Sequence, residues 1–210
     1  MFTASDILNH LVLLFPQVKS ELDFNNHYEL TISVVLSAQT TDILVNKATK
    51  TLFIAYPNFE ALSQALVKDV LSHIHFLGLA NTKAKNIVAL SQKLMTDYQG
   101  LLPCDFDYLI SLPGIGRKSA NVILSEGFNV PRIAVDTHVL RVANRLGFVK
   151  TENPLVVEEK LMQLYDAKDW HSLHLRLVFF GRYFCKAKTP NCPKCPFVSF
   201  CKYEKKILNG

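Results

Sequence analysis

Apolar residues recur at helical spacing along nearly the whole chain, and this pattern leaves few folds open. In residues 27–38 they are so dense that the helix should be buried on nearly all sides and serve as a central helix. Further helical patterns occupy residues 7–14, 42–53, 68–76, 82–95, 106–111, 117–128, 137–146, 154–165 and 170–182. β-Branched runs are short and lie within this periodicity instead of alternating. The sequence therefore predicts an all-α fold.

Composition fits an ordered protein and permits a polyanionic partner without requiring one. With 210 residues and 49% hydrophobic residues, the chain has ample material for a packed core. Its net charge of +5 suits a polyanion, although an ordinary enzyme can carry as much. Residues 1–15 contain no basic leader, and their apolar run 11–15 is too brief for a membrane span or a secretion signal. We expect an intracellular protein without a membrane partner.

A glycine-rich turn, Leu112-Pro113-Gly114-Ile115-Gly116, separates two of the helical patterns. Glycines accept positive φ and let another molecule approach the backbone, so N–H groups at the start of the next helix can form an anion-binding nest. Lys118 lies in the first turn of that helix, where the positive helix end and Arg117 favour a neutral, nucleophilic amine. Taken alone, such a turn is more often a plain connection and such a lysine a solvated one.

Asp136 stands at the N-cap position of the helical pattern 137–146. A carboxylate there is favoured by the unpaired N–H groups of the first turn. A capping role alone would explain the residue, so a catalytic role needs further evidence.

Four of the five cysteines form the pattern Cys185-x6-Cys192-x2-Cys195-x5-Cys201, and three prolines stiffen the segment. Four thiolates so close together predict a metal site instead of disulfides. Zinc and an iron–sulfur cluster both accept four cysteines, but a zinc ribbon usually has two Cys-x2-Cys pairs and only one occurs here. Cys104 lies apart and has no assigned role.

Two polar tips between helices are exposed on this interpretation. The first, Leu36 to Asp42, contains Gln39, and the second contains Leu79, followed by Asn81 or Thr82 as the cap of the next helix. That helix, 82–95, carries a solvated basic face, and no site follows from it. Its basic residues are Lys83, Lys85 and Lys93.

The run LPGIGRKSANV followed by VDTHVLRVANRLG resembles the helix-hairpin-helix and catalytic segments of the endonuclease III family of DNA glycosylases. The resemblance covers nearly the whole chain, and it implies that Lys118 is the catalytic lysine and Asp136 the catalytic aspartate. The four cysteines match the family's [4Fe-4S] loop at every position. Gln39 matches a loop glutamine that enters the duplex, and Leu79 an apolar wedge between bases.

The resemblance also implies two helical lobes. One is a six-helix barrel over residues 22–130, with the helix-hairpin-helix at about residues 107–127. The other comprises 1–21 and 131–210 and bears the cluster. Lys118 and Asp136 would face each other across the groove between them.

By the same resemblance, the protein is a bifunctional DNA glycosylase and abasic-site lyase that acts on oxidised or ring-saturated pyrimidines. Its partner is duplex DNA with damaged bases or abasic sites, and we expect a monomer in the cytoplasm or nucleoid of a bacterium. DNA contacts are expected from Gly114, Gly116 and Arg117, and from Lys186 and Lys188 in the cysteine loop, where two ordinary surface lysines are an equal alternative. One departure is Phe180, where relatives often carry histidine.

Two rival functions stay open at this point. A purely hydrolytic glycosylase of the same superfamily would use water and would lack the hairpin lysine. A non-catalytic DNA-binding module would use the hairpin for phosphate and the cysteines for a structural metal, and it would not need Asp136. Strand nicking on abasic duplex DNA separates an enzyme from a binding module.

Overall fold

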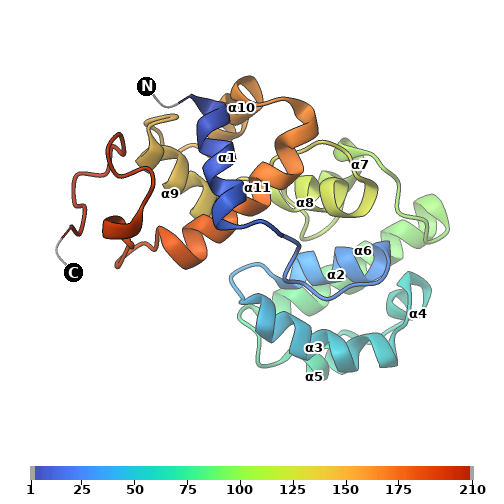
Figure 1. The fold of residues 1–210 in the computed structure, drawn as a ribbon. Helices are drawn as coiled ribbons and strands as arrows, with labels where there is room; N and C mark the ends of the chain where they lie inside the picture. Colours follow the sequence, from blue (N-terminus) through green and yellow to red (C-terminus); the bar gives the residue numbers. More distant parts are fainter. Residues whose placement is uncertain (1–2, 209–210) are drawn as a thin grey trace. The chain divides into compact units, whose positions relative to one another are not determined.

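The computed structural model describes residues 3–208, and residues 1–2 and 209–210, which the expected terminal lobe includes, lie outside the described residues. The chain divides into two compact units, one of residues 20–130 and one of residues 1–19 with 131–210. Within residues 3–208 every regular element is helical, which confirms the all-α prediction (Figure 1).

The unit of residues 20–130 contains the helices α2 to α8 and is built around α2 (His27–Leu36). Every residue of α2 except His27 and Glu29 is buried, so the expected central helix is confirmed. Asn26 caps α2 by accepting a hydrogen bond from the Glu29 N–H. The surrounding helices are α3 (Asp42–Ala55), α4 (Phe59–Ser63), α5 (Val67–Ile74), α6 (Ala80–Tyr98), α7 (Phe106–Ser111) and α8 (Arg117–Phe128). The six expected helices are accompanied by a seventh element, the five-residue α4.

Helix α6 begins at Ala80, earlier than the expected caps Asn81 or Thr82 allow. Leu79 occupies the N-cap position in the left-handed region, with φ of 59°, and no side chain caps the helix. Ala80 is buried, and the Lys83 N–H donates a 3.0 Å hydrogen bond to the Leu79 carbonyl. Packing of Ala80 therefore starts the helix where the sequence offers no capping side chain.

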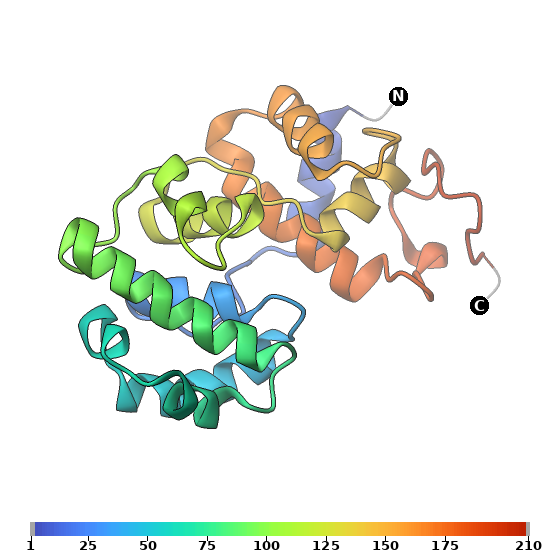
Figure 2. The same ribbon diagram turned by 180° about the vertical axis from the view of Figure 1, so that it is seen from behind.

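The second unit combines α1 (Ala4–Leu14) with α9 (Thr137–Leu146), α10 (Pro154–Leu164) and α11 (Trp170–Phe179). Two short 3₁₀ helices, Ala167–Asp169 and Cys192–Lys194, complete it. The N-terminal segment is tied to α11 because the Arg176 guanidinium donates hydrogen bonds of 3.1 and 3.0 Å to the carbonyls of Phe15 and Pro16. Figure 2 shows α1 beside α11 in this unit. Helix α1 thus shares one hydrophobic core with α9, α10 and α11.

Helix α11 does not stop at Gly181 and Arg182, as the sequence pattern predicted, but continues as a π-helix over Phe180–Phe184. The Cys185 N–H donates to the Phe180 carbonyl five residues earlier, which is the wide turn of a π-helix. Phe180 stacks on Phe184 with ring centroids 5.2 Å apart. A Cβ on Gly181 would lie 2.8 Å from the Cβ of His138, so only glycine lets the π-helix approach α9 this closely.

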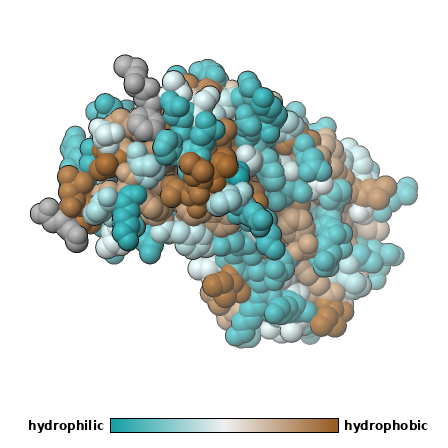
Figure 3. Space-filling model, in the orientation of Figure 1, coloured by the Kyte–Doolittle hydropathy of each residue, from teal (hydrophilic) through white to brown (hydrophobic). Residues whose placement is uncertain are grey.

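No helix within residues 3–208 combines the length and the apolar character needed to cross a bilayer. On the face shown in Figure 3, hydrophobic patches are separate and lie among hydrophilic side chains. Isolated exposed apolar residues such as Ile43 and Ile54 need no partner to explain them.

Candidate functional site: a glycine hairpin, an N-cap aspartate and a four-cysteine pocket

The hairpin between α7 and α8 is held from inside the 20–130 unit. Leu112 and Ile115 are buried, and the Ile115 N–H donates a 3.1 Å hydrogen bond to the Leu112 carbonyl. Gly114 has φ of +83°, and a Cβ there would come within 3.1 Å of the side chains of Asn86 and Val35, so glycine is required by both conformation and space. The turn is therefore packed closely against the core of this unit.

Gly116 differs from Gly114, because its φ of −99° suits any residue and a Cβ there would meet nothing within 4 Å. The expectation that both glycines are needed for positive φ is wrong for Gly116. As the N-cap of α8 it brings no side chain to cap the helix, and the N–H groups of a first turn have no acceptor inside the helix. No neighbour among residues 3–208 requires glycine at this position, whereas close approach of an anion to the helix end would.

Arg117 and Lys118 are both exposed in the first turn of α8. The Arg117 guanidinium lies over the Phe106 ring, 5.2 Å from its centroid. This contact holds one cation beside the hairpin. Together with the helix end it makes the start of α8 electropositive.

Asp136 caps α9 as predicted. Its Oδ1 accepts hydrogen bonds of 2.8 Å from the N–H groups of both His138 and Val139, and the residue is half-buried. Behind it, burial lowers the pKa of the His138 imidazole, which lies 3.3 Å from Arg141 Nη2. The cap fixes the orientation of the carboxylate and leaves Oδ2 out of these two bonds.

The two loop residues predicted to be exposed, Gln39 and Leu79, are both exposed, and 55% of Leu79 is accessible. Both adopt the left-handed region, with φ of 52° and 59°. This conformation costs a residue with a Cβ roughly 1–2 kcal/mol, so it persists only where the surroundings enforce it.

Lys83 corrects the sequence analysis, which placed it on a solvated basic face with Lys85 and Lys93. Only 3% of Lys83 is exposed, and its Nζ donates a 2.6 Å hydrogen bond to Thr40 Oγ1. Lys85 is exposed as predicted, whereas Lys93 is half-buried and pairs with Asp97 at 2.8 Å. Helical periodicity failed here because the loop after α2 covers this part of α6, a tertiary contact that the sequence of α6 does not encode.

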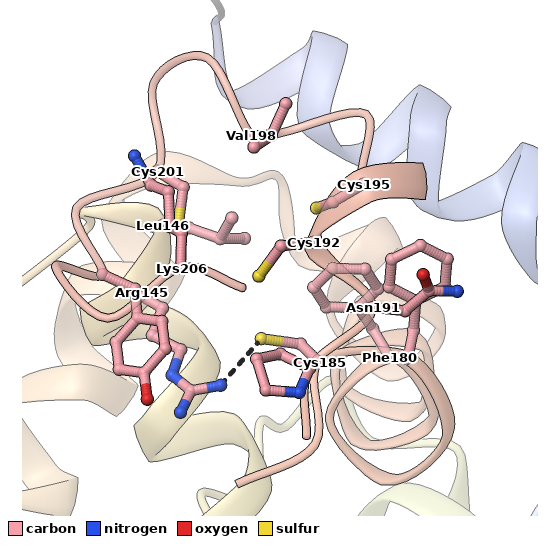
Figure 4. Close-up of a pocket in the computed structure, with 13 residues that line it drawn as sticks. Arg145, Leu146, Phe180, Cys185, Asn191, Cys192, Cys195, Val198, Cys201 and Lys206 are labelled. Carbon is pink, nitrogen blue, oxygen red and sulfur yellow. Dashed lines mark hydrogen bonds between the residues drawn. The ribbon is translucent and has the colours of Figure 1, made fainter. Parts of the chain in front are cut away.

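Cys185, Cys192, Cys195 and Cys201 all line one pocket, and Figure 4 shows their sulfur atoms turned toward a shared space. The empty volume of the pocket is about 370 Å³, part of it open to solvent. Among residues 3–208, no histidine or carboxylate lines this pocket. Burial raises the pKa of the Cys195 thiol to about 11, so this sulfur would be a thiolate at neutral pH only beside a cation.

Arg145 binds the cysteine loop, a role that the sequence analysis missed. It is buried, and its guanidinium donates a 3.3 Å hydrogen bond to Cys185 Sγ (Figure 4). It also donates to the carbonyls of Lys186 and Ala187 at 2.9 Å each. The Tyr203 ring covers it with a centroid distance of 3.7 Å. An arginine in the last turn of a helix is common, and no signal in the sequence marks this one.

The other residues singled out in and near the cysteine loop differ in their exposure. Lys186 and Lys188 are exposed, and Phe180 is buried in the pocket wall, 5.4 Å from the Phe197 ring. Phe180 thus packs as part of an aromatic wall beside the cysteines. Cys104 is exposed and lies away from the other four in the sequence.

Comparison with known proteins gives one consistent result. Residues 32–167 match the family described as HhH-GPD superfamily base excision DNA repair protein. The chain is 47% identical to endonuclease III of Bacillus subtilis over 92% of this chain and 89% of the relative, and 45% identical to endonuclease III of Rickettsia conorii over 95% and 97%. The chain belongs to the endonuclease III family. It is therefore a DNA glycosylase and abasic-site lyase of base excision repair.

Solved structures agree with this membership. A non-covalent endonuclease III–DNA complex aligns with a TM-score of 0.92 at 45% identity, covering 96% of both chains. A trapped endonuclease III–DNA covalent intermediate aligns with the same score and identity, covering 96% of this chain and 97% of that one. Both neighbours were solved with DNA, which agrees with the predicted partner of this chain.

Proposed function

We propose that this protein removes oxidised or ring-saturated pyrimidines from duplex DNA and then nicks the abasic site, with Lys118 as the nucleophile. The observation that carries the proposal is the exposed Lys118 in the first turn of α8. It directly follows a hairpin in which neither the backbone conformation nor a neighbouring residue among 3–208 requires Gly116 to be glycine. That arrangement sets an amine beside a helix end suited to phosphate.

In the proposed reaction, the Lys118 amine attacks C1′ of the extruded nucleotide, and the bond from C1′ to the base breaks. Loss of the amine proton and opening of the sugar give a Schiff base between Nζ and C1′. Removal of a C2′ proton then breaks the C3′–O bond, which cuts the strand by β-elimination. A purely hydrolytic glycosylase would need no such lysine.

Asp136 is proposed to assist deprotonation and to stabilise the positive charge that develops on the sugar. Its carboxylate is oriented by the two N–H groups that it caps, so it is set in place before the substrate arrives. Preorganised charge of this kind lowers the barrier without reorganisation during the reaction.

The substrate base is stacked in the duplex and must be extruded before the amine can reach C1′. We assign the filling of the resulting gap to Gln39 and Leu79, because both are exposed on tips held in a left-handed conformation. An apolar wedge such as Leu79 is a common device for opening a base stack.

The four cysteines are proposed to hold a [4Fe-4S] cluster. Within residues 3–208, no group of three His, Cys, Asp or Glu side chains is arranged to hold a single metal ion, yet four thiols surround one pocket. Four cysteine thiolates are the ligand set of a [4Fe-4S] cluster, in which each cysteine binds a different iron. The cluster would brace the C-terminal loop and hold Lys186 and Lys188 outward for phosphate.

A monomer is proposed as the active form. The exposed apolar residues are scattered, and the visible face has separate patches instead of one continuous apolar area (Figure 3). Duplex DNA is then the main macromolecular partner.

The test uses matched duplexes that contain a ring-saturated pyrimidine, an oxidised purine or no lesion. The proposal predicts release of the pyrimidine and cleavage at the same site, with slower release of the purine and none from undamaged DNA. Release of the base without strand cleavage would indicate a hydrolytic glycosylase. Binding without any reaction would indicate the non-catalytic module.

A further inference from the structure

Lys83 is a buried amine whose position the reaction described above does not use. Burial lowers its pKa, and within the described residues no carboxylate forms an ion pair with it. It also lies near the N-terminus of α6, where the helix dipole disfavours a cation. A methionine would fill the same space without this cost, so packing alone does not account for the amine.

The amine is part of a short hydrogen-bond chain that spans Gln39. Lys83 Nζ donates to Thr40 Oγ1 at 2.6 Å, and the Thr40 hydroxyl donates to the Ala38 carbonyl at 3.3 Å. The residues on both sides of Gln39 are therefore tied to one point on α6. This contact helps to hold Gln39 at its unfavourable φ of 52°.

The same lysine is bonded to the second loop through its backbone. The Lys83 N–H donates a 3.0 Å hydrogen bond to the carbonyl of Leu79. The two loops also touch each other, because a Cβ on Gly78 would lie 3.3 Å from the Gln39 carbonyl oxygen. Figure 2 shows both loops side by side at the N-terminal end of α6.

We propose that Lys83 is a positioning residue that fixes Gln39 and Leu79 relative to each other, so that both enter the duplex in one step. The inference rests on the proposed role of these two residues as gap fillers. Without the amine, Thr40 loses its tie to α6, and each loop samples its conformations independently. The entropy lost in ordering both loops at the moment of insertion then adds to the free-energy barrier for extruding the nucleotide.

The experiment measures extrusion directly, with 2-aminopurine placed opposite an abasic site in the duplex. Its fluorescence rises when its neighbours unstack, so the rate of the rise reports insertion of the loops before chemistry. The variants are Lys83→Met, which keeps the volume, and Thr40→Val, which keeps the branched shape and removes the hydroxyl. Thr40→Ser is the conservative rescue, and Lys85→Met is the matched control on the exposed face of the same helix.

Lys83→Met and Thr40→Val should each slow extrusion about tenfold, which is the loss expected for one buried hydrogen bond to an amine. The double variant should be no slower than the slower single variant, because both remove the same interaction. Thr40→Ser and Lys85→Met should extrude at the wild-type rate. The melting temperature of Lys83→Met should stay equal or rise, since a buried polar group is replaced by an apolar one.

If both Lys83→Met and Thr40→Val extrude the nucleotide at the wild-type rate, the inference is wrong. It is also wrong if the extrusion rate of these variants falls only in proportion to a lower melting temperature. If Lys83→Met does not fold, the pair Thr40→Val and Thr40→Ser decides, because equal rates in the two contradict a role for the hydroxyl. Failure of the proposed function is separate, since it would leave the wild-type protein unable to cleave the abasic strand.

Discussion

The Asp136 carboxylate accepts a 2.8 Å hydrogen bond from the backbone N–H of Val139, so the proposed catalytic carboxylate is also a helix cap. Its second bond, to the His138 N–H, is of the same length. One side chain therefore serves both stability and the proposed chemistry, and a suitable substitution can separate the two.

Asp136→Asn provides that separation. Asparagine caps a helix about as well as aspartate, so thermal unfolding should be near that of the wild type, whereas single-turnover strand cleavage should fall by roughly 100-fold or more. Asp136→Ala should in addition lose about 1 kcal/mol of stability through the lost cap. Near-normal cleavage by Asp136→Asn would reduce the residue to a cap.

The second prediction concerns the metal. The purified protein should be yellow-brown and should contain iron and inorganic sulfide, because four cysteines line one pocket and four thiolates are the ligand set of a [4Fe-4S] cluster. Zinc without iron would contradict this. Cys195→Ser should give little soluble protein, since the loop depends on its ligands for a fixed shape.

Arg145 provides a third prediction, which sequence patterns did not suggest. Arg145→Met removes the donors to Cys185 Sγ and to two loop carbonyls, so iron should be lost to a chelator roughly 10- to 100-fold faster. The measurement is the decay of the visible absorbance. Lys206→Met is the control, because Lys206 lines the same pocket, and an equal rate in both variants would exclude a specific role for the guanidinium.

The fourth prediction concerns phosphate contacts. Affinity for duplex DNA should fall steeply with salt, with a log–log slope of about −0.9 per phosphate contacted. Lys188→Ala should flatten the slope by about one contact if the exposed loop lysine touches phosphate. Lys168→Ala, which removes an exposed lysine paired with Asp166, should leave the slope unchanged. An unaltered slope in Lys188→Ala would remove that lysine from the DNA interface.

Local signals in the sequence were sufficient for much of the fold. The burial of α2, the bounds of α7, the start of α8 and the Asp136 cap follow from periodicity and capping chemistry, which act over a few residues. The cysteine spacing likewise predicted four thiols at one pocket.

What the sequence did not reveal depends on contacts between distant segments. Lys83 fits a solvated helix face by its spacing, but it is buried because Thr40, 43 residues earlier, meets its amine. Arg145 is bonded to carbonyls about 40 residues away. The π-helix after Phe179 depends on how Gly181 packs against α9. Hydrophobic periodicity describes one helix at a time, so it cannot predict contacts between residues of distant segments.

The most direct test of the central claim is borohydride trapping on abasic duplex DNA. If Lys118 is the nucleophile, reduction during turnover should leave the wild-type protein covalently joined to DNA. Lys118→Ala should abolish both trapping and nicking while still binding the duplex, because the hairpin N–H groups remain, and Lys168→Ala should trap normally. Trapping of Lys118→Ala at the wild-type rate would mean that another amine is the nucleophile and would contradict the account.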